Sequence, residues 1–374
     1  MTRARLLTAP EDLARLGLRP GETEPWEVGR RQEVAEGRSE LWHVEAGTDD
    51  GTAVAVAFCL VGPAGEGRAA TLVNLFLTTP DGRRHQRAVP GVVDVADVGT
   101  TRCELPFGPH RTSGDLRHLD VEVAPDDGPG LHLVCEALVR PYRPGGTGHV
   151  ALGGDGEHHF AVQAVARCRV SGTVTVDGRT WDVAGQGYSD HQWTDVDLVG
   201  SWHHWLWGRF HGERLTAMVF DLVTSDRYGL TRMPLLGVMD STGAVVVDRR
   251  GAVESTVETE RDPESGGERP ARARHVARDG GRVVELVVER GHPLVELDAH
   301  AATEPGGEQR ARYDELGVRP SYERYRARGA LTLTDASGTT TEQGQVVYEL
   351  NDVGWPESEG RVPRPWPRHP REAS

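Results

Sequence analysis

One segment of the chain, residues 187–211, concentrates the residue types suited to acid chemistry and ligand binding. Five of the nine tryptophans lie in it or just before it: Trp181, Trp193, Trp202, Trp205 and Trp207. Its histidines are His191, His203, His204 and His211, and its carboxyl groups include Asp190 and Asp195. Clustered rings line either a core seam or a cavity. A carboxyl group among indoles is desolvated, which favours its protonated form, so the segment predicts an apolar site with an acid.

Tyr188 and Asp190 share a face if this segment is an extended strand, because side chains alternate along a strand. Two interpretations stay open. In one, Asp190 caps backbone N–H groups and Tyr188 anchors a barrel corner. In the other, Asp190 is a proton donor and Tyr188 holds its second oxygen. They exclude each other, because a capping carboxylate is stabilised in its charged form. Ser189 and His191 would point the opposite way, so Ser189-Asp190-His191 cannot assemble into a catalytic triad.

Residues 201–211 predict a second strand. Its alternation places five residues on one face: His203, Trp205, Trp207, Arg209 and His211. Because an arginine on that face opposes a bound cation, we favour histidines that hydrogen-bond in a cavity wall over a metal site. We expect no metal and no cofactor. The rings of Trp202, Trp205 and Trp207 are suited to stabilising a carbocation on a substrate.

Charge and missing motifs narrow the function classes. The net charge of −15 opposes nucleic acid and anionic membranes as main partners, since both require a positive surface. The sequence contains no GxGxxG, P-loop or GxSxG motif, which removes the usual support for a nucleotide-binding protein or a serine hydrolase. It contains no lysine, which excludes Schiff-base chemistry.

The location of the protein is expected to be cytoplasmic. No stretch approaches the roughly 18 apolar residues of a membrane span, and the N-terminus does not resemble a signal peptide. Peripheral contact with lipid stays open. The four cysteines are widely spaced, and we expect buried, reduced thiols rather than disulfides.

Short runs of alternating or β-branched residues, separated by Gly, Pro and Asp clusters, predict an all-β protein of antiparallel barrels with few short helices. The length of 374 residues favours two domains. We place an N-terminal extension at residues 1–25, one barrel at 26–195, a second barrel at 196–352 and a Pro/Arg-rich tail at 353–374.

Several local predictions are specific. Asp177-Gly178 predicts a two-residue hairpin turn. Residues 282–289 and 294–300 read as a hairpin around Gly291, and residues 261–274 read as an exposed loop. Short helices are expected near residues 10–17 and 309–316.

Four short motifs carry a resemblance to a known family. They are Gly187-Tyr188-Ser189-Asp190, Trp205-Leu206-Trp207-Gly208-Arg209, His158-His159-Phe160, and Trp42 followed by Asp49-Asp50-Gly51. The chain resembles the carotenoid 1,2-hydratases and related AttH-like proteins, which have two lipocalin-like (calycin) barrels in tandem. It departs from the family pattern at Gln192, Thr194 and Phe160, where the family has Asn, Gly and Trp. The second half matches mainly in strand pattern and in residues 344–350.

The resemblance implies a cofactor-independent lyase or isomerase of isoprenoid or other natural-product metabolism. Its substrate would be small, apolar and rich in alkenes, held in a Trp-lined cavity and hydrated or cyclised by acid catalysis. Members also include pericyclases that fold a polyene, and lipid-associated proteins without known chemistry, so a pericyclase and a lipid or pigment carrier remain alternatives. The implied catalytic residues are Asp190, Tyr188 and His158. The implied substrate-binding residues are Phe160, Trp202, His203, Trp205, Trp207, Arg209 and Trp42.

Overall fold

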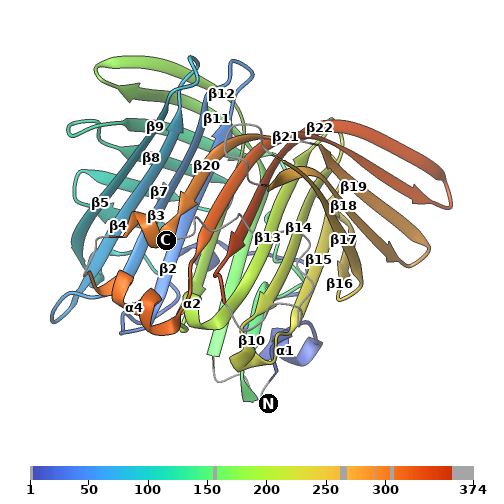
Figure 1. The fold of residues 1–374 in the computed structure, drawn as a ribbon, viewed down its shortest axis with the longest axis horizontal. Helices are drawn as coiled ribbons and strands as arrows, with labels where there is room; N and C mark the ends of the chain where they lie inside the picture. Colours follow the sequence, from blue (N-terminus) through green and yellow to red (C-terminus); the bar gives the residue numbers. More distant parts are fainter. Residues whose placement is uncertain (1–2, 155–157, 262–267, 290, 304–306, 356–374) are drawn as a thin grey trace. The chain divides into compact units, whose positions relative to one another are not determined.

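A computed structural model of the chain describes residues 3–154, 158–261, 268–289, 291–303 and 307–355. The chain divides into two compact units. The N-terminal barrel comprises Leu6–Asp197 with Thr242–Ala244, and the C-terminal barrel comprises Leu198–Ser241 and Val245–Ser374 with Met1–Arg5. Each unit is built on one antiparallel sheet curled into a near-barrel (Figure 1). From residue 356 on, the predicted tail lies outside the described residues.

The N-terminal barrel contains the first twelve strands. They are β1 (Arg5–Leu6), β2 (Ser39–Gly47), β3 (Ala53–Pro63), β4 (Arg68–Thr78), β5 (Arg84–Asp94), β6 (Cys103–Phe107), β7 (His110–Gly114), β8 (His118–Val123), β9 (Gly130–Ala137), β10 (His149–Leu152), β11 (His158–Val176) and β12 (Arg179–Thr194). Its short helical segments are α1 (Pro10–Arg15), η1 (Pro25–Val28) and η2 (Val95–Asp97).

The C-terminal barrel contains ten strands among the described residues. They are β13 (Trp202–His211), β14 (Thr216–Thr224), β15 (Arg232–Met239), β16 (Val245–Arg250), β17 (Val253–Arg261), β18 (Glu268–Asp279), β19 (Arg282–Glu289), β20 (His292–Asp298), β21 (Ser321–Asp335) and β22 (Gly338–Asp352). Its helical segments are α2 (Leu198–Ser201), η4 (Asp226–Tyr228), α3 (Ala299–Ala302) and α4 (Glu308–Leu316).

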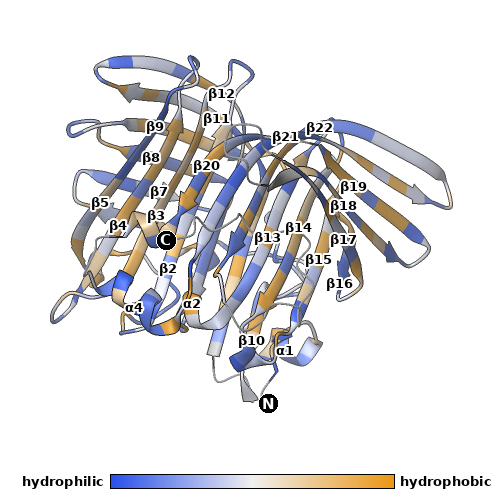
Figure 2. Ribbon diagram, in the orientation of Figure 1, coloured by the Kyte–Doolittle hydropathy of each residue, from blue (hydrophilic) through white to orange (hydrophobic). Residues whose placement is uncertain are grey.

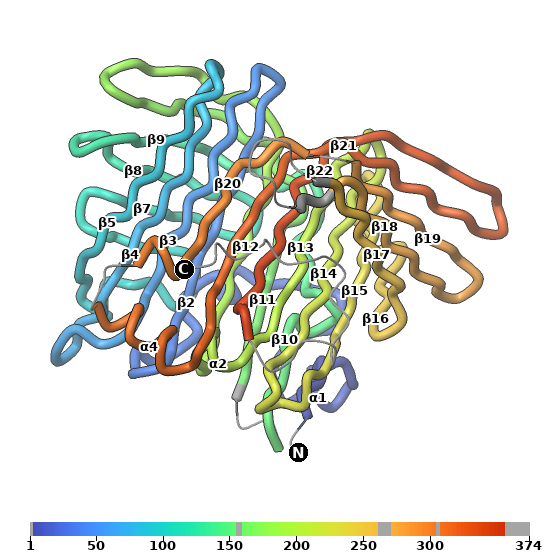
Figure 3. The backbone as a smooth tube through the Cα atoms, in the orientation of Figure 1, coloured from blue at the N-terminus to red at the C-terminus, as the bar shows by residue number. Residues whose placement is uncertain are grey.

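The two barrels share one strand arrangement. The N-terminal order is β5-β4-β3-β2-β12-β11-β9-β8-β7-β6, and the C-terminal order is β16-β15-β14-β13-β22-β21-β19-β18-β17. In each barrel the first long strand therefore pairs with the last. From this central pair the next strands extend to one edge of the sheet, and the later strands lead from the opposite edge back to the centre (Figure 3). The central pairs are β2 with β12 and β13 with β22, which makes these four strands the frame for the site.

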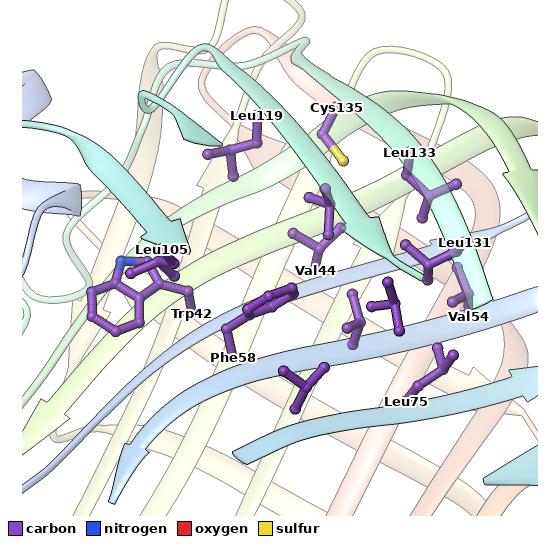
Figure 4. Close-up of a cluster of buried hydrophobic side chains, with 14 of the residues drawn as sticks. Trp42, Val44, Val54, Phe58, Leu75, Leu105, Leu119, Leu131, Leu133 and Cys135 are labelled. Carbon is purple, nitrogen blue, oxygen red and sulfur yellow. The ribbon is translucent and has the colours of Figure 1, made fainter. Parts of the chain in front are cut away.

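Alternation along the strands separates each core from the opposite sheet face, as the hydropathy colouring indicates (Figure 2). On β2 the core residues are Trp42, Val44 and Ala46. Their side chains pack with those of Phe58, Leu75, Leu105 and Leu131 inside the N-terminal barrel (Figure 4). In the C-terminal barrel the core residues on β13 are Leu206 and Phe210, and those on β22 are Val346, Tyr348 and Leu350.

Several local predictions are confirmed. Asp177 and Gly178, with φ of 51° and 74°, form the two-residue turn between β11 and β12. Helices α1 and α4 occupy the two predicted helical positions. All four cysteines are free thiols, and burial raises the pKa of Cys59 to about 12.

Two local predictions are wrong. Strand β19 pairs with β18 and β21, and β20 pairs with β21, so residues 282–289 and 292–298 do not form a hairpin. Residues 268–274 belong to β18, which pairs with β17, rather than to a loop. Strands β17 and β18 carry charged residues on the face away from the core. Their sequences are therefore as polar as those of a loop. Among the described residues, no helix is long and apolar enough to cross a membrane.

Candidate active site

The predicted acid lies on the face of the β2–β12 pair that points away from the barrel core. Asp190 pairs across the strands with His43, and Tyr188 pairs with Glu45. Because Trp42 and Val44 face the core, these four side chains face the opposite way. All four are buried in spite of this orientation. Two successive cross-strand pairs on this face thus hold two buried carboxyl groups, an imidazole and a phenol.

The two carboxyl oxygens of Asp190 have different surroundings. Gln192 donates a hydrogen bond from Nε2 to Oδ1 at 3.0 Å. Oδ2 lies 3.7 Å from Nδ1 of His43, beyond hydrogen-bond distance. The side chain of Asp190 is only 3% exposed. Because Oδ1 accepts from Gln192, a proton on this carboxyl group would sit on Oδ2.

His191 points into the N-terminal barrel, away from Asp190, so the adjacent Ser189-Asp190-His191 does not form a triad. Its ring stacks on Trp42, with centroids 4.6 Å apart, and lies 4.8 Å from the ring of Trp193. Nδ1 lies 2.7 Å from the carbonyl oxygen of Glu27, and Nε2 lies 2.7 Å from Oε1 of Glu40. Since a carbonyl oxygen only accepts, Nδ1 is a donor, and one further proton lies between Nε2 and Glu40. Two indoles of this barrel, those of Trp42 and Trp193, thus contact the ring of His191.

A small cavity lies inside the N-terminal barrel beside these residues. It has a volume of about 10 Å³, and its wall includes Trp42, His43, Gln163, Ser189 and Asp190. A cavity of this size holds at most about one water molecule. In this conformation it has no room for a polyene.

The C-terminal barrel carries a comparable carboxyl group on its last strand. Glu349 of β22 lies on the face opposite to the core and accepts three hydrogen bonds. They come from Nε1 of Trp205 at 2.9 Å, from the hydroxyl of Tyr322 at 2.8 Å and from the guanidinium of Arg324 at 2.7 Å. Three donors, one of them a guanidinium, thus fix the position of this carboxyl group.

Trp207 lies on the same face and has cationic neighbours. The guanidinium carbons of Arg209 and Arg324 lie 5.7 and 6.0 Å from the centroid of its ring. These distances are within the range of cation–π attraction. The ring proposed to stabilise a substrate cation thus already contacts two protein cations.

His203 and His204, which precede Trp205, are hydrogen-bonded to each other. Nδ1 of His203 and Nδ1 of His204 lie 2.6 Å apart, so one ring donates and the other accepts. Both are buried. The carbonyl oxygen of Trp202 accepts a hydrogen bond from Nε1 of Trp355 at 2.9 Å. Within the described ranges, no group of three or more His, Cys, Asp or Glu side chains could hold a metal ion.

Two upstream residues lie further along the sheet. Asp190 pairs with Ala164 of β11, whereas Phe160 pairs with Thr194. Four residues of a strand span about 13 Å, so Phe160 shares the face of Asp190 at about that distance along the strand. His158 begins β11 two residues further on, and its side chain lies outside the described part of the chain. The histidine beside Asp190 is His43.

Comparison with known proteins places the chain in a family. A family model matches residues 42–318, which span most of both barrels. The chain belongs to the family described as Domain of unknown function (DUF7064). No curated protein matches this DUF7064 sequence.

Solved structures share its fold. A protein of Nitrosomonas europaea, named as an AttH candidate, is 16% identical with a TM-score of 0.59, covering 90% of this chain and 98% of its own. Kievitone hydratase from Nectria haematococca is 14% identical, with a TM-score of 0.52 and coverages of 89% and 99%. CghA, solved with Sch210972, is 12% identical, with a TM-score of 0.56 and coverages of 89% and 96%. The AttH-like fold of tandem lipocalin-like barrels is confirmed.

Sequence reasoning missed four residues of these clusters: His43, Glu45, Glu40 and Glu349. His43 follows Trp42 directly, and an ionisable ring within an otherwise apolar strand could have indicated a site residue. The carboxyl groups gave none, because glutamates are frequent in exposed strands and only cross-strand pairing shows that these three are buried.

Proposed function

We propose that this protein is a cofactor-independent hydratase or cyclase that acts on an apolar, alkene-rich small molecule, with Asp190 as the proton donor. The observation that carries the proposal is the buried Asp190 beside His43, on a sheet face directed away from the core. Among the described residues no donor lies within hydrogen-bond distance of its Oδ2, whereas Glu349 accepts from a guanidinium. In line with this, the fold relatives include a protein named as a hydratase.

The reaction would begin with transfer of the proton from Oδ2 of Asp190 to one carbon of a double bond, leaving a carbocation and a carboxylate. Addition of water and return of one proton to Asp190 gives a hydrated product. Attack by a second double bond, followed by loss of a proton to Asp190, gives a cyclised isomer. His43, whose Nδ1 lies 3.7 Å from Oδ2, would help to restore the proton of Asp190 once the two groups come within hydrogen-bond distance. Alkene protonation requires a site shielded from bulk water, which the burial of Asp190 supports.

A pericyclase is the second candidate, and it is favoured by the shared fold with CghA. In that case a folded conformation of the substrate supplies most of the rate, and Tyr188 would polarise a carbonyl. The substrate in either case is proposed to be small and apolar, in a cytoplasmic protein without nucleic-acid partners.

The test is incubation with squalene, geranylgeraniol and lycopene in deuterated water, followed by mass spectrometry of the products. We expect one nonexchangeable deuterium per product, and Asp190→Asn should lower the rate by at least about a hundredfold. Asp195→Asn is the matched control, because its Oδ1 accepts a backbone hydrogen bond from His159 at 2.6 Å and an amide oxygen can accept the same bond.

The other outcomes are distinct. An unchanged rate in Asp190→Asn rules out the acid role. An isomerised product without deuterium supports the pericyclase. A bound ligand recovered unchanged by every variant supports a carrier.

A further inference from the structure

The N-terminal barrel has an unpaired seam. Strands β5 and β6 are the two ends of its strand order, and no backbone pairing joins them in the described part of the chain. The guanidinium of Arg87 on β5 instead donates to the carbonyl oxygens of Ala124 and Pro129, the second at 3.2 Å. Arg87 thus ties β5 to the loop between β8 and β9, while β5 and β6 themselves form no strand ladder in the described part of the chain.

A cavity of about 280 Å³ opens at this seam. We call it the seam pocket; its wall includes Thr71, Val73, Val89, Arg87, Phe107 and His110. Its volume is close to the lower end of the range for small-molecule sites, roughly 300–1,000 Å³. Buried Val73 and Phe107 give it an apolar floor. The pocket thus has the size and lining of a small-molecule site.

His110, which lines the seam pocket, supplies a hydrogen-bond donor. The residue is 2% exposed, and its Nδ1 accepts a hydrogen bond from the backbone N–H of Ala124 at 3.1 Å. Burial, together with nearby Arg87, lowers the pKa of His110, so the ring is neutral at neutral pH. A neutral ring that accepts at Nδ1 carries its hydrogen on Nε2. Among the described residues, this Nε2–H has no hydrogen-bond partner.

The charged residues around the seam pocket favour a neutral ligand over an anion. Its wall includes one arginine, Arg87, and two carboxylates, Asp126 and Asp127. This balance of one positive and two negative charges opposes an anion. A neutral oxygen acceptor meets no such repulsion.

We propose that the seam pocket binds a neutral, largely apolar molecule through a carbonyl oxygen that accepts from Nε2–H of His110. The apolar body would lie on Phe107 and Val73. This site is separate from Asp190, because Asp190 lies on β12 in the middle of the strand order and the seam pocket lies at its two ends; it does not depend on the proposed function.

The test uses prodan, a neutral aromatic ketone whose emission moves to longer wavelength when its carbonyl accepts a hydrogen bond. Prodan is titrated into the full chain and its fluorescence is recorded. Val92 lines the rim of the seam pocket and is 43% exposed, so Val92→Trp fills the rim without disturbing the core. We expect this variant to weaken binding at least about tenfold. Val61→Trp, at another exposed valine, is the matched control and should bind as the wild type does.

Two histidine variants test the hydrogen bond. His110→Asn keeps an acceptor near the Nδ1 position for Ala124 and removes the Nε2 donor, so we expect about three- to tenfold weaker binding and a shift of emission to shorter wavelength. His110→Gln keeps a donor near the Nε2 position and should retain the long-wavelength emission. Wild-type binding by Val92→Trp, or wild-type emission by His110→Asn, would overturn the proposal. Loss of binding in Asp190→Asn would also overturn it, because the probe would then occupy the other site.

Discussion

At the scale of single residues, three buried carboxyl groups of this chain have three different surroundings. Asp190 accepts one side-chain hydrogen bond, from Gln192. Glu349 accepts three. Glu40 accepts from His191 and from two backbone N–H groups, those of Arg31 and Gln32. The carboxyl group of Asp190 thus accepts the fewest hydrogen bonds of the three. The environment, rather than the residue type, separates the proposed acid from the other two carboxyl groups.

The pair formed by His191 and Glu40 gives a stability prediction. His191→Phe keeps an aromatic ring against Trp42 but leaves the buried Glu40 without its imidazole partner. We expect the free energy of unfolding to fall by about 3–5 kcal/mol, measured by urea denaturation followed by tryptophan fluorescence. The control is His118→Phe at an exposed position of β8, where the change should stay within about 0.5 kcal/mol. Equal stabilities of the two variants would show that the pair is not a stabilising unit.

At the scale of elements, the close approach of β12 to its neighbours explains the glycine of the Gly-Tyr-x-Asp motif. A Cβ atom on Gly187 would lie 2.3 Å from the carbonyl oxygen of Glu45 and 2.6 Å from Cγ2 of Val170. Neither atom is the end of a flexible side chain. Gly187 therefore lets β2 and β12 pair directly beside Tyr188 and Asp190.

This close approach predicts the effect of a methyl group. Gly187→Ala should lower the free energy of unfolding by about 1–3 kcal/mol, because the added atom forces the two strands apart. The matched variant is Gly91→Ala on the edge strand β5, where a Cβ atom would meet only Oγ1 of Thr71, at 3.0 Å. We expect a smaller change there, and thermal unfolding of both variants checks the order. A Gly187→Ala protein as stable as Gly91→Ala would contradict the close contact.

At the scale of the whole molecule, each barrel contains a histidine that burial keeps neutral. Desolvation lowers the pKa of His149 in the N-terminal barrel and of His275 in the C-terminal barrel to about 3. His275 contacts the hydroxyl groups of Ser255 and Tyr348, at 2.9 and 3.2 Å. Burial lowers the pKa of His110 and His300 as well. All four shifts have the same sign, so they act together on stability.

The lowered pKa values of these histidines predict how the free energy of unfolding depends on pH. The unfolded chain takes up protons at these histidines once the pH falls below 6.5, whereas the folded chain takes them up only near pH 3 for His149 and His275. The free energy of unfolding should therefore fall between about pH 6.5 and 3, by up to about 1.4 kcal/mol per pH unit for each buried histidine. Above pH 6.5 these groups should have no effect.

Urea denaturation at several pH values between 7 and 5 measures this slope. His275→Gln removes one titrating group and should reduce the slope by about one proton. His118→Gln, at an exposed position, should leave it unchanged. A slope that is the same in His275→Gln and in the wild type would rule out His275 as a source of the pH dependence.

Alternation, turn residues and composition determined the all-β class, the turn at Asp177 and Gly178, and the short helices from the sequence alone, because these features depend on neighbours along the chain. The same alternation placed Tyr188 and Asp190 on one face and His191 on the other.

Only the tertiary structure decided which strands pair and what surrounds each side chain. The partner of Asp190, His43, lies far away in the sequence, and their meeting depends on the first and last long strands of a barrel pairing. Likewise, β20 pairs with β21 rather than with the neighbouring β19. Strand pairing brings distant residues together through backbone hydrogen bonds that are nearly independent of side-chain type, so no local pattern specifies the partner.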